Sequence, residues 1–330
     1  MSKQLFVAWV PFQRRSVSMQ PYFDYDLEFI RLSFKHRCLR PLEYVFKAQR
    51  TFKFLLERKP NLFWIQLPPN FLLHLSYLYR KLISPTTKIV GDCHHGIFCS
   101  PWVKVPGTVS LLNHCDLVIV HSKFLRDQAL SLGIHPDKIQ ILEDPPAQVA
   151  IPEQASIRQW PHPLAVFPCS FAVDEPIQEL LEASRLVPDI TFALTGNPHR
   201  ARGSHNFLNL PPNVKLTGFL SESDFNHLLH EADVILGLTK LDGIQLSAAS
   251  EAVGIGKPLV LSNTKTLHSL FHRGPVFVDS SQSQAIAQGC LDALSKVDSL
   301  TCEIRSLKAE REKSWQKQAG LIMDALDLHP

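Results

Sequence analysis

Short, mostly apolar runs recur along the chain, separated by segments in which apolar residues follow a helical period. The runs lie at residues 5–10, 62–67, 88–93, 116–121 and 139–144, and then at 164–169, 191–196, 214–218, 233–238, 258–263 and 275–279. Their apolar residues are continuous rather than alternating, which is typical of strands covered on both faces. The pattern therefore predicts an α/β protein whose parallel strands are joined by helices.

Prolines concentrate in the middle of the chain, where such a density prevents a regular element. They are Pro145, Pro146, Pro152, Pro161 and Pro163. We expect a linker at residues 151–163, between an N-terminal domain of residues 1–150 and a second domain of residues 164–300. Residues 301–330 have a helical pattern with no strand after it, so we expect this tail to pack back on the first domain. The prediction is two Rossmann-like, doubly wound domains that face a cleft.

The composition is that of a globular protein, with 45% hydrophobic and 20% charged residues among 330. A formal net charge of +3 gives no case for nucleic-acid binding, for which a strongly basic surface is expected. The seven cysteines are scattered and include no C-x-x-C pair. Thiols in a reducing compartment explain them most simply, so we expect a cytoplasmic protein.

The stretch DGIQLSAASEAVGIGKP, residues 242–258, combines a turn with an unusual helix. It predicts a helix from Leu246 to Ile255 that stops at Gly256. The N–H groups at the start of such a helix attract phosphate, and the small residues 247–250 let a bulky ligand approach. Glu251 lies more than a turn inside, where a carboxylate can accept hydrogen bonds from sugar hydroxyls. This arrangement suits a nucleotide sugar, and the alternative is a surface helix with a solvated glutamate.

Two pairs of residues follow predicted strands at the edge where parallel sheets bind ligands. His94 and His95 come after the run 88–93, and an imidazole there can transfer a proton or donate a hydrogen bond. The alternative is that one of them caps a loop. No metal site is predicted, because these histidines and Asp92 are too close in sequence to converge easily. Arg14 and Arg15 follow the first run and either contact a phosphate or are solvated loop charges.

The segment NFLLHLSYLYRKLI, residues 70–83, is rich in Phe, Leu and Tyr and carries Arg80 and Lys81 near its end. Such a segment suits peripheral contact with the inner face of a membrane. A buried helix that crosses between two strands is the simpler interpretation, because predicted strands precede and follow it closely.

Three stretches, in this order along the chain, resemble glycosyltransferase family 4. They are HSKFLRDQALSLGIHPDKIQILEDPP, NVKLTGFLSESDFNHLLHEADVILGL and SEAVGIGKPLVLSN. The stretches WIQLPP, GDCHH and SFAVDE are similar to the cytosolic β-mannosyltransferase family of lipid-linked-oligosaccharide assembly. The resemblance covers about residues 60–270. It implies a GT-B fold and the metal-independent transfer of a hexosyl group from a UDP-, GDP- or ADP-linked sugar to a hydroxyl of a glycan or lipid-linked acceptor, without a cofactor.

The resemblance implies a set of site residues. The catalytic candidates are His94, His95 and Glu251, and the acceptor or phosphate candidates are Arg14 and Arg15. The donor-binding candidates are Gly196, Arg200, Gly218, Phe219, Lys240, Asp242, Gly243, Ile244, Ser247 and Glu251. The helix start, with Lys240 and Arg200 or Arg202, would stabilise the departing diphosphate. The loop from Gly218 would hold the base through its backbone, although Phe219 is equally compatible with a core position.

Several departures from the family pattern keep other functions open. Asp242 and Glu251 have eight residues between them, whereas the paired glutamates of the family have seven. The stretch FPCSFAVDEP contains no Arg or Lys, and PFQRRS replaces a glycine-rich loop. One alternative is therefore a non-catalytic GT-B subunit that binds a partner or a sugar nucleotide. Another is a nucleotide-sugar epimerase. The family 4 likeness favours retention at the anomeric carbon, and the mannosyltransferase likeness favours inversion.

Overall fold

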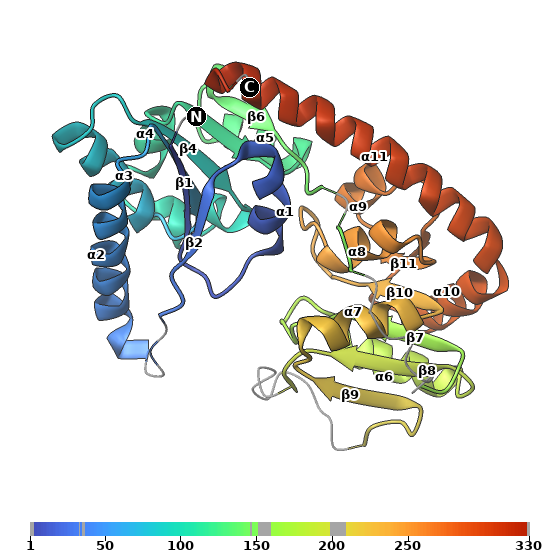
Figure 1. The fold of residues 1–330 in the computed structure, drawn as a ribbon. Coiled ribbons are helices and arrows are strands. Elements are labelled where there is room, and N and C mark those ends of the chain that lie inside the picture. Colours follow the sequence, from blue (N-terminus) through green and yellow to red (C-terminus); the bar gives the residue numbers. More distant parts are fainter. Residues whose placement is uncertain are drawn as a thin grey trace. The chain divides into compact units, whose positions relative to one another are not determined.

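The computed structural model describes residues 3–32, 34, 37–145, 147–150, 160–198 and 209–328. The chain forms two compact units. The first unit contains Met1–Pro145 and Ser314–Pro330, and the second contains Pro146–Lys313. The last helix, α11 (Val297–Leu326), therefore begins in the second unit and ends in the first (Figure 1).

The first unit is built on one six-stranded sheet in which every neighbouring pair is parallel. Its strands are β1 (Gln4–Ala8), β2 (Asp26–Phe29), β3 (Leu62–Leu67), β4 (Lys88–Cys93), β5 (Leu117–Val120) and β6 (Ile139–Ile141). The spatial order is β2-β1-β3-β4-β5-β6, so the direction of winding changes between β1 and β3. An open parallel sheet of this kind gathers ligand-binding groups at the carboxyl ends of its strands.

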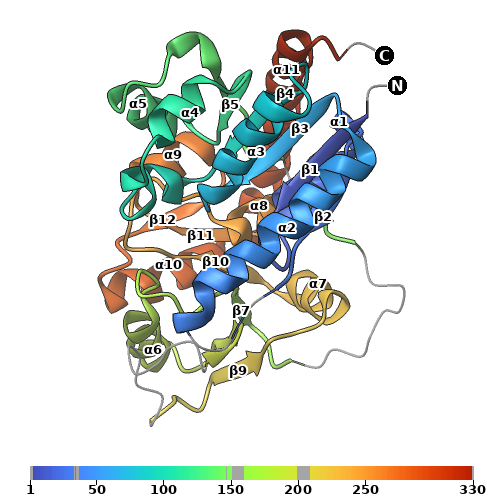
Figure 2. The same cartoon turned by 90° about the vertical axis from the view of Figure 1, so that its left-hand side faces the viewer.

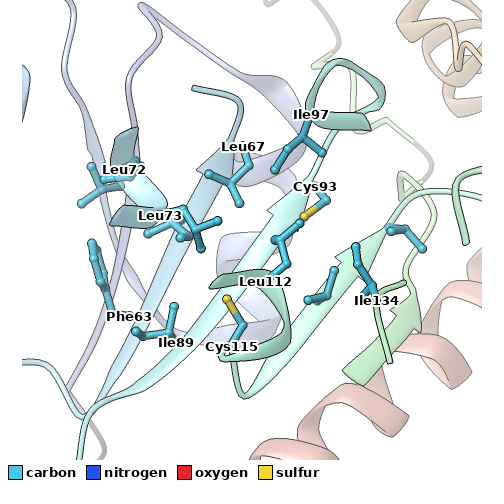
Figure 3. Close-up of a cluster of buried hydrophobic side chains, with 14 of the residues drawn as sticks. Phe63, Leu67, Leu72, Leu73, Ile89, Cys93, Ile97, Leu112, Cys115 and Ile134 are labelled. Atoms are coloured by element: carbon cyan, nitrogen blue, oxygen red, sulfur yellow. The ribbon is translucent and has the colours of Figure 1, made fainter. Parts of the chain in front are cut away.

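Helices cover both faces of this sheet. They are α1 (Arg14–Phe23), α2 (Arg40–Arg58), α3 (Phe71–Leu82), α4 (Thr108–Asn113) and α5 (Lys123–Ser131), with short 3₁₀ turns at Arg37–Leu39, His95–Phe98, Trp102–Lys104 and Pro136–Lys138. One buried cluster joins Leu55 of α2 and Leu72 of α3 to the sheet, and Figure 3 shows part of it around Leu67 and Cys93. On the other face, Phe23 of α1 packs against both Trp64 of β3 and Trp315 of α11, in a second buried cluster. Burial on both faces explains the continuous apolar runs.

The second unit repeats the plan with a different winding order. Its strands are β7 (Leu164–Phe167), β8 (Thr191–Thr195), β9 (Val214–Gly218), β10 (Val234–Gly237), β11 (Leu259–Ser262) and β12 (Val276–Val278). Its helices are α6 (Ile177–Leu186), α7 (Glu222–Glu231), α8 (Ser247–Ile255), α9 (Lys265–Leu270) and α10 (Ser283–Ser295), followed by α11. The order β12-β11-β10-β7-β8-β9 is that of a doubly wound dinucleotide-binding sheet, with its switch point between β7 and β10 (Figure 2).

The predicted fold class, two doubly wound α/β units, is confirmed. Every predicted run contains a strand, and the runs 62–67, 88–93 and 214–218 have the observed bounds. Among the described residues, the strand missed by the prediction is β2, whose residues DLEF alternate polar with apolar and are exposed or half-buried at the edge of the sheet. Residues 151–159 of the predicted linker lie outside the described residues. Segment 70–83 contains α3, which crosses from β3 to β4 as the simpler interpretation predicted. One side of α3 is buried, but large apolar residues such as Leu78 and Leu82 are exposed on the other.

Within the described part of the chain, no helix has both the length and the apolar character needed to cross a membrane.

Candidate functional site

A charged cluster lies at the carboxyl ends of β4, β5 and β6 in the first unit. Asp92 is the last but one residue of β4, and its register partner in β5 is Ile119, two residues before His121. Arg15, in the first turn of α1, reaches the same edge from the loop that follows β1. The parallel arrangement therefore brings together residues that lie far apart in the sequence.

Arg15 is held by acceptors on every side of its guanidinium. Its Nε lies 3.2 Å from Oδ1 and 3.4 Å from Oδ2 of Asp92. Its Nη1 donates to Oδ1 of Asp144 at 2.6 Å and to the Glu143 carbonyl at 2.9 Å, and its Nη2 donates to the Leu142 carbonyl at 2.8 Å. The Arg15 and Asp92 side chains are buried, so this ion pair is isolated from water.

Burial and charge oppose each other at these groups. Burial alone would raise the pKa of Asp92, but the Arg15 guanidinium and hydrogen bonds from the neighbouring side chains hold that pKa well below its usual range. The same balance lowers the pKa of Asp144, again through Arg15. Burial would lower the pKa of Arg15, and the two carboxylates raise it instead. At neutral pH the cluster therefore contains one cation between two carboxylates.

Two imidazoles contact Asp92 from neighbouring strand ends. The Nε2 atom of His121 lies 3.2 Å from Oδ1 of Asp92, and the Nε2 atom of His94 lies 3.6 Å from Oδ2. The two rings meet edge to face, with centroids 4.2 Å apart. Burial, together with the nearby Arg15, lowers the pKa of His121 to about 4, so this ring is neutral at physiological pH. Because a carboxylate only accepts, the Nε2 atom of the neutral His121 carries the proton.

His94 is the more accessible of the two imidazoles, with 30% of its side chain exposed. Its Nε2 atom also contacts the side-chain amide of Gln13. His95 is placed differently, with its Nε2 atom 3.3 Å from the Cys99 sulfur and its pKa lowered by burial. Of the two histidines predicted as catalytic candidates, the structure therefore joins only His94 to the Asp92 cluster.

The cluster suits proton transfer better than metal binding. One ligand atom from each of Asp92, His94 and His121 lies within 4.8 Å of the others, which is close enough for three ligands of one ion. However, both carboxylate oxygens of Asp92 already face the Arg15 guanidinium, which would repel a divalent cation. A partly exposed imidazole beside a buried carboxylate is instead a common arrangement for moving a proton.

The structure separates the two arginines predicted to contact phosphate. Arg15 is neither a solvated loop charge nor open to a ligand, because its side chain is the buried partner of Asp92 and Asp144. Arg14 lies nearer the surface, with its guanidinium carbon 5.9 Å from the centre of the Phe12 ring. A phosphate contact by Arg15 is therefore incompatible with this arrangement, and the prediction stays open only for Arg14.

In the second unit, α8 follows β10 at the switch point of the sheet and has nearly the predicted bounds. It ends at Gly256, whose φ of 73° is the left-handed conformation that glycine adopts readily. Glu251 is 4% exposed and lies among buried small residues of the helix. The alternative of a solvated glutamate on a surface helix is therefore wrong.

Asp242 fixes the loop between β10 and α8. Its Oδ1 atom accepts hydrogen bonds from the backbone N–H of Gly243 at 2.8 Å and of Thr266 in α9 at 3.0 Å. Burial would raise the pKa of Asp242, but the hydrogen bonds from Thr266 and Gly243 lower it. Gly243 has a φ of 80°, which the turn requires. Ile244 and Ser247 complete the approach to α8, and Ser247 is exposed.

Hydrogen bonds join the loops that follow β7 and β10, and the loop after β10 leads into α8. The Thr239 hydroxyl donates to Oδ2 of Asp174 at 2.9 Å, and the Lys240 backbone N–H donates to the Asp174 carbonyl at 2.8 Å. The Lys240 ammonium lies 2.5 Å from Oε1 of Glu179, with 40% of its side chain exposed. Because β7 and β10 flank the switch point, Lys240 lies at the edge where such sheets bind ligands.

Gly196 directly follows β8 and Gly218 is the last residue of β9, so both lie at the same edge of the sheet. The Gly196 N–H donates to the Gly218 carbonyl at 3.0 Å, and a Cβ on Gly196 would lie 2.1 Å from the Cys169 carbonyl oxygen. Phe219 follows with 88% of its surface exposed, so the core alternative for this residue is wrong. Arg200 and Arg202 lie outside the described residues.

Three members of these sites were not predicted from the sequence. His121 and Asp144 belong to the Asp92 cluster, and Asp174 ties two loops of the second unit. His121 and Asp144 each end a predicted strand run, as His94 and His95 nearly do, so the signal was present in their positions. Only the order of the strands in the sheet shows that these ends are neighbours.

Solved structures similar to this chain cover nearly its whole length. The Anabaena protein HepE in complex with UDP-glucose has a TM-score of 0.76 and 14% identity, over 98% of this chain and 100% of that chain. Sucrose-phosphate synthase from Thermosynechococcus elongatus has a TM-score of 0.71 and 12% identity, over 99% of both chains. A putative UDP-N-acetylglucosamine 2-epimerase from Listeria monocytogenes has a TM-score of 0.66 and 13% identity, over 98% of this chain and 95% of that chain.

No family model and no curated protein matches this sequence. At the identities of the solved structures, the likeness concerns the arrangement of strands and helices. The chain therefore has the GT-B fold, whereas its membership of family 4 or of the mannosyltransferase family stays a prediction.

Proposed function

We propose that the protein is a glycosyltransferase that moves a hexosyl group from a nucleotide sugar to an acceptor hydroxyl, without a metal ion. The observation that carries this proposal is the burial of Glu251 in α8, directly after the switch-point strand β10. A glutamate is almost never fully buried unless its carboxylate is paired, so the Glu251 carboxylate is held in a fixed position at the edge where such sheets bind ligands. Small neighbouring residues and the N–H groups at the helix start leave a diphosphate and a sugar room to bind beside it.

The donor is held by the second unit in this proposal. Backbone N–H groups of the first turn of α8 stabilise the diphosphate as it leaves, and Lys240 assists from the neighbouring loop. Glu251 accepts hydrogen bonds from sugar hydroxyls, and the backbone from Gly218 to Phe219 holds the base. HepE was solved with UDP-glucose, which supports testing a UDP-linked sugar first.

The proton of the acceptor hydroxyl is handled by the first unit. During transfer, the bond between the anomeric carbon and the diphosphate breaks while the acceptor oxygen bonds to that carbon. His94 accepts the acceptor proton or its hydrogen bond, and Asp92 stabilises the imidazolium that forms. Neutral His121 and the cation of Arg15 hold the Asp92 carboxylate in place. His94 is thus the catalytic group, and His121 and Arg15 are positioning residues.

A lipid-linked or glycan acceptor belongs to the same proposal. A lipid-linked acceptor would bring the protein to the inner face of a membrane, so we propose a cytoplasmic protein with peripheral membrane contact.

Isothermal titration with UDP, GDP, ADP and their hexose conjugates tests the donor site. We expect one nucleotide series to bind. Glu251→Gln should keep the affinity for the free nucleoside diphosphate and weaken binding of its sugar conjugate by about tenfold or more, since a charged hydrogen bond contributes about 1.5–3 kcal/mol. The control is Glu182→Gln on α6, where the glutamate is largely exposed, and its titrations should match the wild type. A wild-type protein that binds no nucleotide would contradict the proposal.

A nucleotide-sugar epimerase is the second candidate, because the Listeria protein with the same fold carries that description. Incubation with the donor and no acceptor separates the two functions. An epimerase yields an isomerised donor, whereas a transferase releases nucleoside diphosphate slowly by hydrolysis. Donor hydrolysis that disappears in both Glu251→Ala and His94→Ala would exclude a non-catalytic subunit.

A further inference from the structure

Helices α2 and α3 of the first unit present large apolar side chains to solvent. Their exposed fractions lie between 40% and 68%. The residues are Leu42, Val45, Phe46 and Leu56 of α2 and Phe71, Leu78, Leu82 and Ile83 in or directly after α3, which we call the α2–α3 surface. Both helices lie on the same face of the sheet (Figure 1), and their buried residues share one core cluster.

The exposure of α2 is unusual because the helix already has a core-facing side. Thr51 and Leu55 are fully buried, as expected for the inner stripe of a helix that covers a sheet. The outer side of such a helix is normally polar, but here Leu42, Val45 and Phe46 occupy it at helical spacing. A concentration of large apolar side chains on one surface indicates a partner rather than chance exposure.

An apolar groove of about 540 Å³ adds to this surface between the two helices. Phe52 and Leu56 of α2 and Leu75 of α3 line it, together with the ion pair of Lys53 and Glu57. The groove therefore offers apolar surface on which part of an acyl chain can lie, and the basic residues that attract anionic headgroups lie elsewhere on the same two helices.

The segment that carries the surface is strongly basic. Residues 40–83 contain eight lysines and arginines and only two glutamates, although the whole chain has a formal charge of +3. The remainder of the chain is therefore net negative. Four of these basic residues pair with carboxylates, namely Lys47, Lys53, Arg58 and Arg80. No ion pair among the described residues involves Arg50, Lys59 or Lys81. The surplus positive charge is complementary to an anionic partner.

We propose that the α2–α3 surface docks on the surface of an anionic lipid bilayer. Apolar side chains would enter the boundary between headgroups and acyl chains, and each nearby Lys or Arg would add about 1 kcal/mol of attraction to anionic lipid. A second copy of the chain fits less well, because a symmetric contact would bring two basic segments together. A nucleic acid would match the charge and leave the apolar residues in water.

This inference deepens the proposed function, because it identifies the partner that would present a lipid-linked acceptor. It stands on the exposed residues of the first unit alone. Nucleotide binding belongs to the second unit, so a failure of one can be distinguished from a failure of the other.

Co-sedimentation with vesicles of phosphatidylcholine, with and without phosphatidylglycerol, tests the proposal on the full chain. We expect binding to the vesicles that contain phosphatidylglycerol, and weaker binding at high salt. Phe46→Glu and Leu82→Glu should each reduce this binding by about tenfold, because each removes buried apolar area and adds repulsion. Leu186→Glu and Leu291→Glu, at exposed leucines of the second unit, are the matched controls and should bind as the wild type.

Nucleotide titration of the same variants is the control for folding, because a folded variant should bind nucleotide with the affinity of the wild type. Wild-type protein that stays in the supernatant with anionic vesicles would overturn the proposal, as would equal losses in the control variants. Light scattering provides a further test: a dimer that forms with concentration and is lost in Phe46→Glu would assign the surface to a second copy instead. A wild-type protein that binds anionic vesicles but no nucleotide would support membrane docking by the α2–α3 surface and contradict the proposed donor site.

Discussion

The Nε atom of Arg15 lies 3.2 Å from Oδ1 of Asp92, and water reaches almost none of either side chain. Removing the cation would leave the carboxylates of Asp92 and Asp144 without their main counter-charge. We expect Arg15→Met to lower the free energy of unfolding by about 3–5 kcal/mol, the range found when one partner of a buried ion pair is removed. Urea unfolding followed by circular dichroism measures this change.

A matched substitution at an exposed ion pair is the control. Arg185 pairs with Glu182, and at least 40% of each side chain is exposed. Arg185→Met should therefore change the free energy of unfolding by less than about 1 kcal/mol. Equal effects of the two substitutions would show that the burial of Arg15 contributes nothing to stability.

The acid stability of the protein should depend on His121. Its pKa is about 4 in the folded chain and 6.5 in its ordinary state, so the unfolded chain binds more protons between these values. The contribution of His121 to stability is therefore complete above pH 6.5 and is lost as the pH falls towards 4. The difference between the folded and ordinary pKa values of His121 corresponds to about 3 kcal/mol of stability.

We expect urea midpoints to fall with acidification more steeply in the wild type than in His121→Asn. His135→Asn, which changes an exposed histidine of the same unit, should retain the slope of the wild type. The depressed pKa of Asp92 acts in the same direction at lower pH, below about 4. A His121→Asn protein with an unchanged slope would contradict the assignment of a neutral, buried imidazole.

Gly196 and Gly218 allow a test of the backbone conformation at the carboxyl ends of β8 and β9. Both have positive φ values, 97° and 73°, but a Cβ on Gly196 meets the Cys169 carbonyl, whereas a Cβ on Gly218 has open space. Gly218→Ala should cost about 1 kcal/mol of stability for the backbone conformation alone. Gly196→Ala should cost at least about 2 kcal/mol, because the Cys169 loop must also move. The denaturant midpoints of the two variants are compared. Equal midpoints would contradict the close approach of Gly196 to the Cys169 carbonyl.

The sequence predicted the sheets well because their strands are buried on both faces and read as continuous apolar runs. It missed β2, an edge strand whose Asp26 is exposed and whose Glu28 is half-buried, since nothing in this four-residue run of alternating polar and apolar residues distinguishes it from a loop. The predicted α8 was correct because Asp242-Gly243 and Gly256 mark its approach and its end by their backbone requirements.

The site was harder to predict, because its members meet through the order of strands rather than through sequence spacing. Arg15 and Asp144 are far apart in the sequence, and only the positions of α1 and β6 show that they bond. A basic residue after a first strand is equally compatible with a phosphate ligand and a counter-ion, and burial decides between them. The small residues beside Glu251 predict that its carboxylate binds a sugar, and the structure shows that this side chain is buried.

His94 and His95 are adjacent in the sequence and differ in what they contact, so they form their own control pair. His94 faces the buried carboxylate of Asp92, while His95 lies beside the Cys99 sulfur. We expect His94→Asn to reduce kcat by about 10²–10⁴-fold, the usual contribution of a general acid or base, while the affinity for the nucleoside diphosphate stays unchanged. His95→Asn should keep kcat within about threefold, since it leaves the Asp92 pair intact. Donor turnover followed by release of nucleoside diphosphate, with titration of the same proteins, measures both quantities. A His95→Asn protein as inactive as His94→Asn would show that the contact with Asp92 does not select the catalytic imidazole.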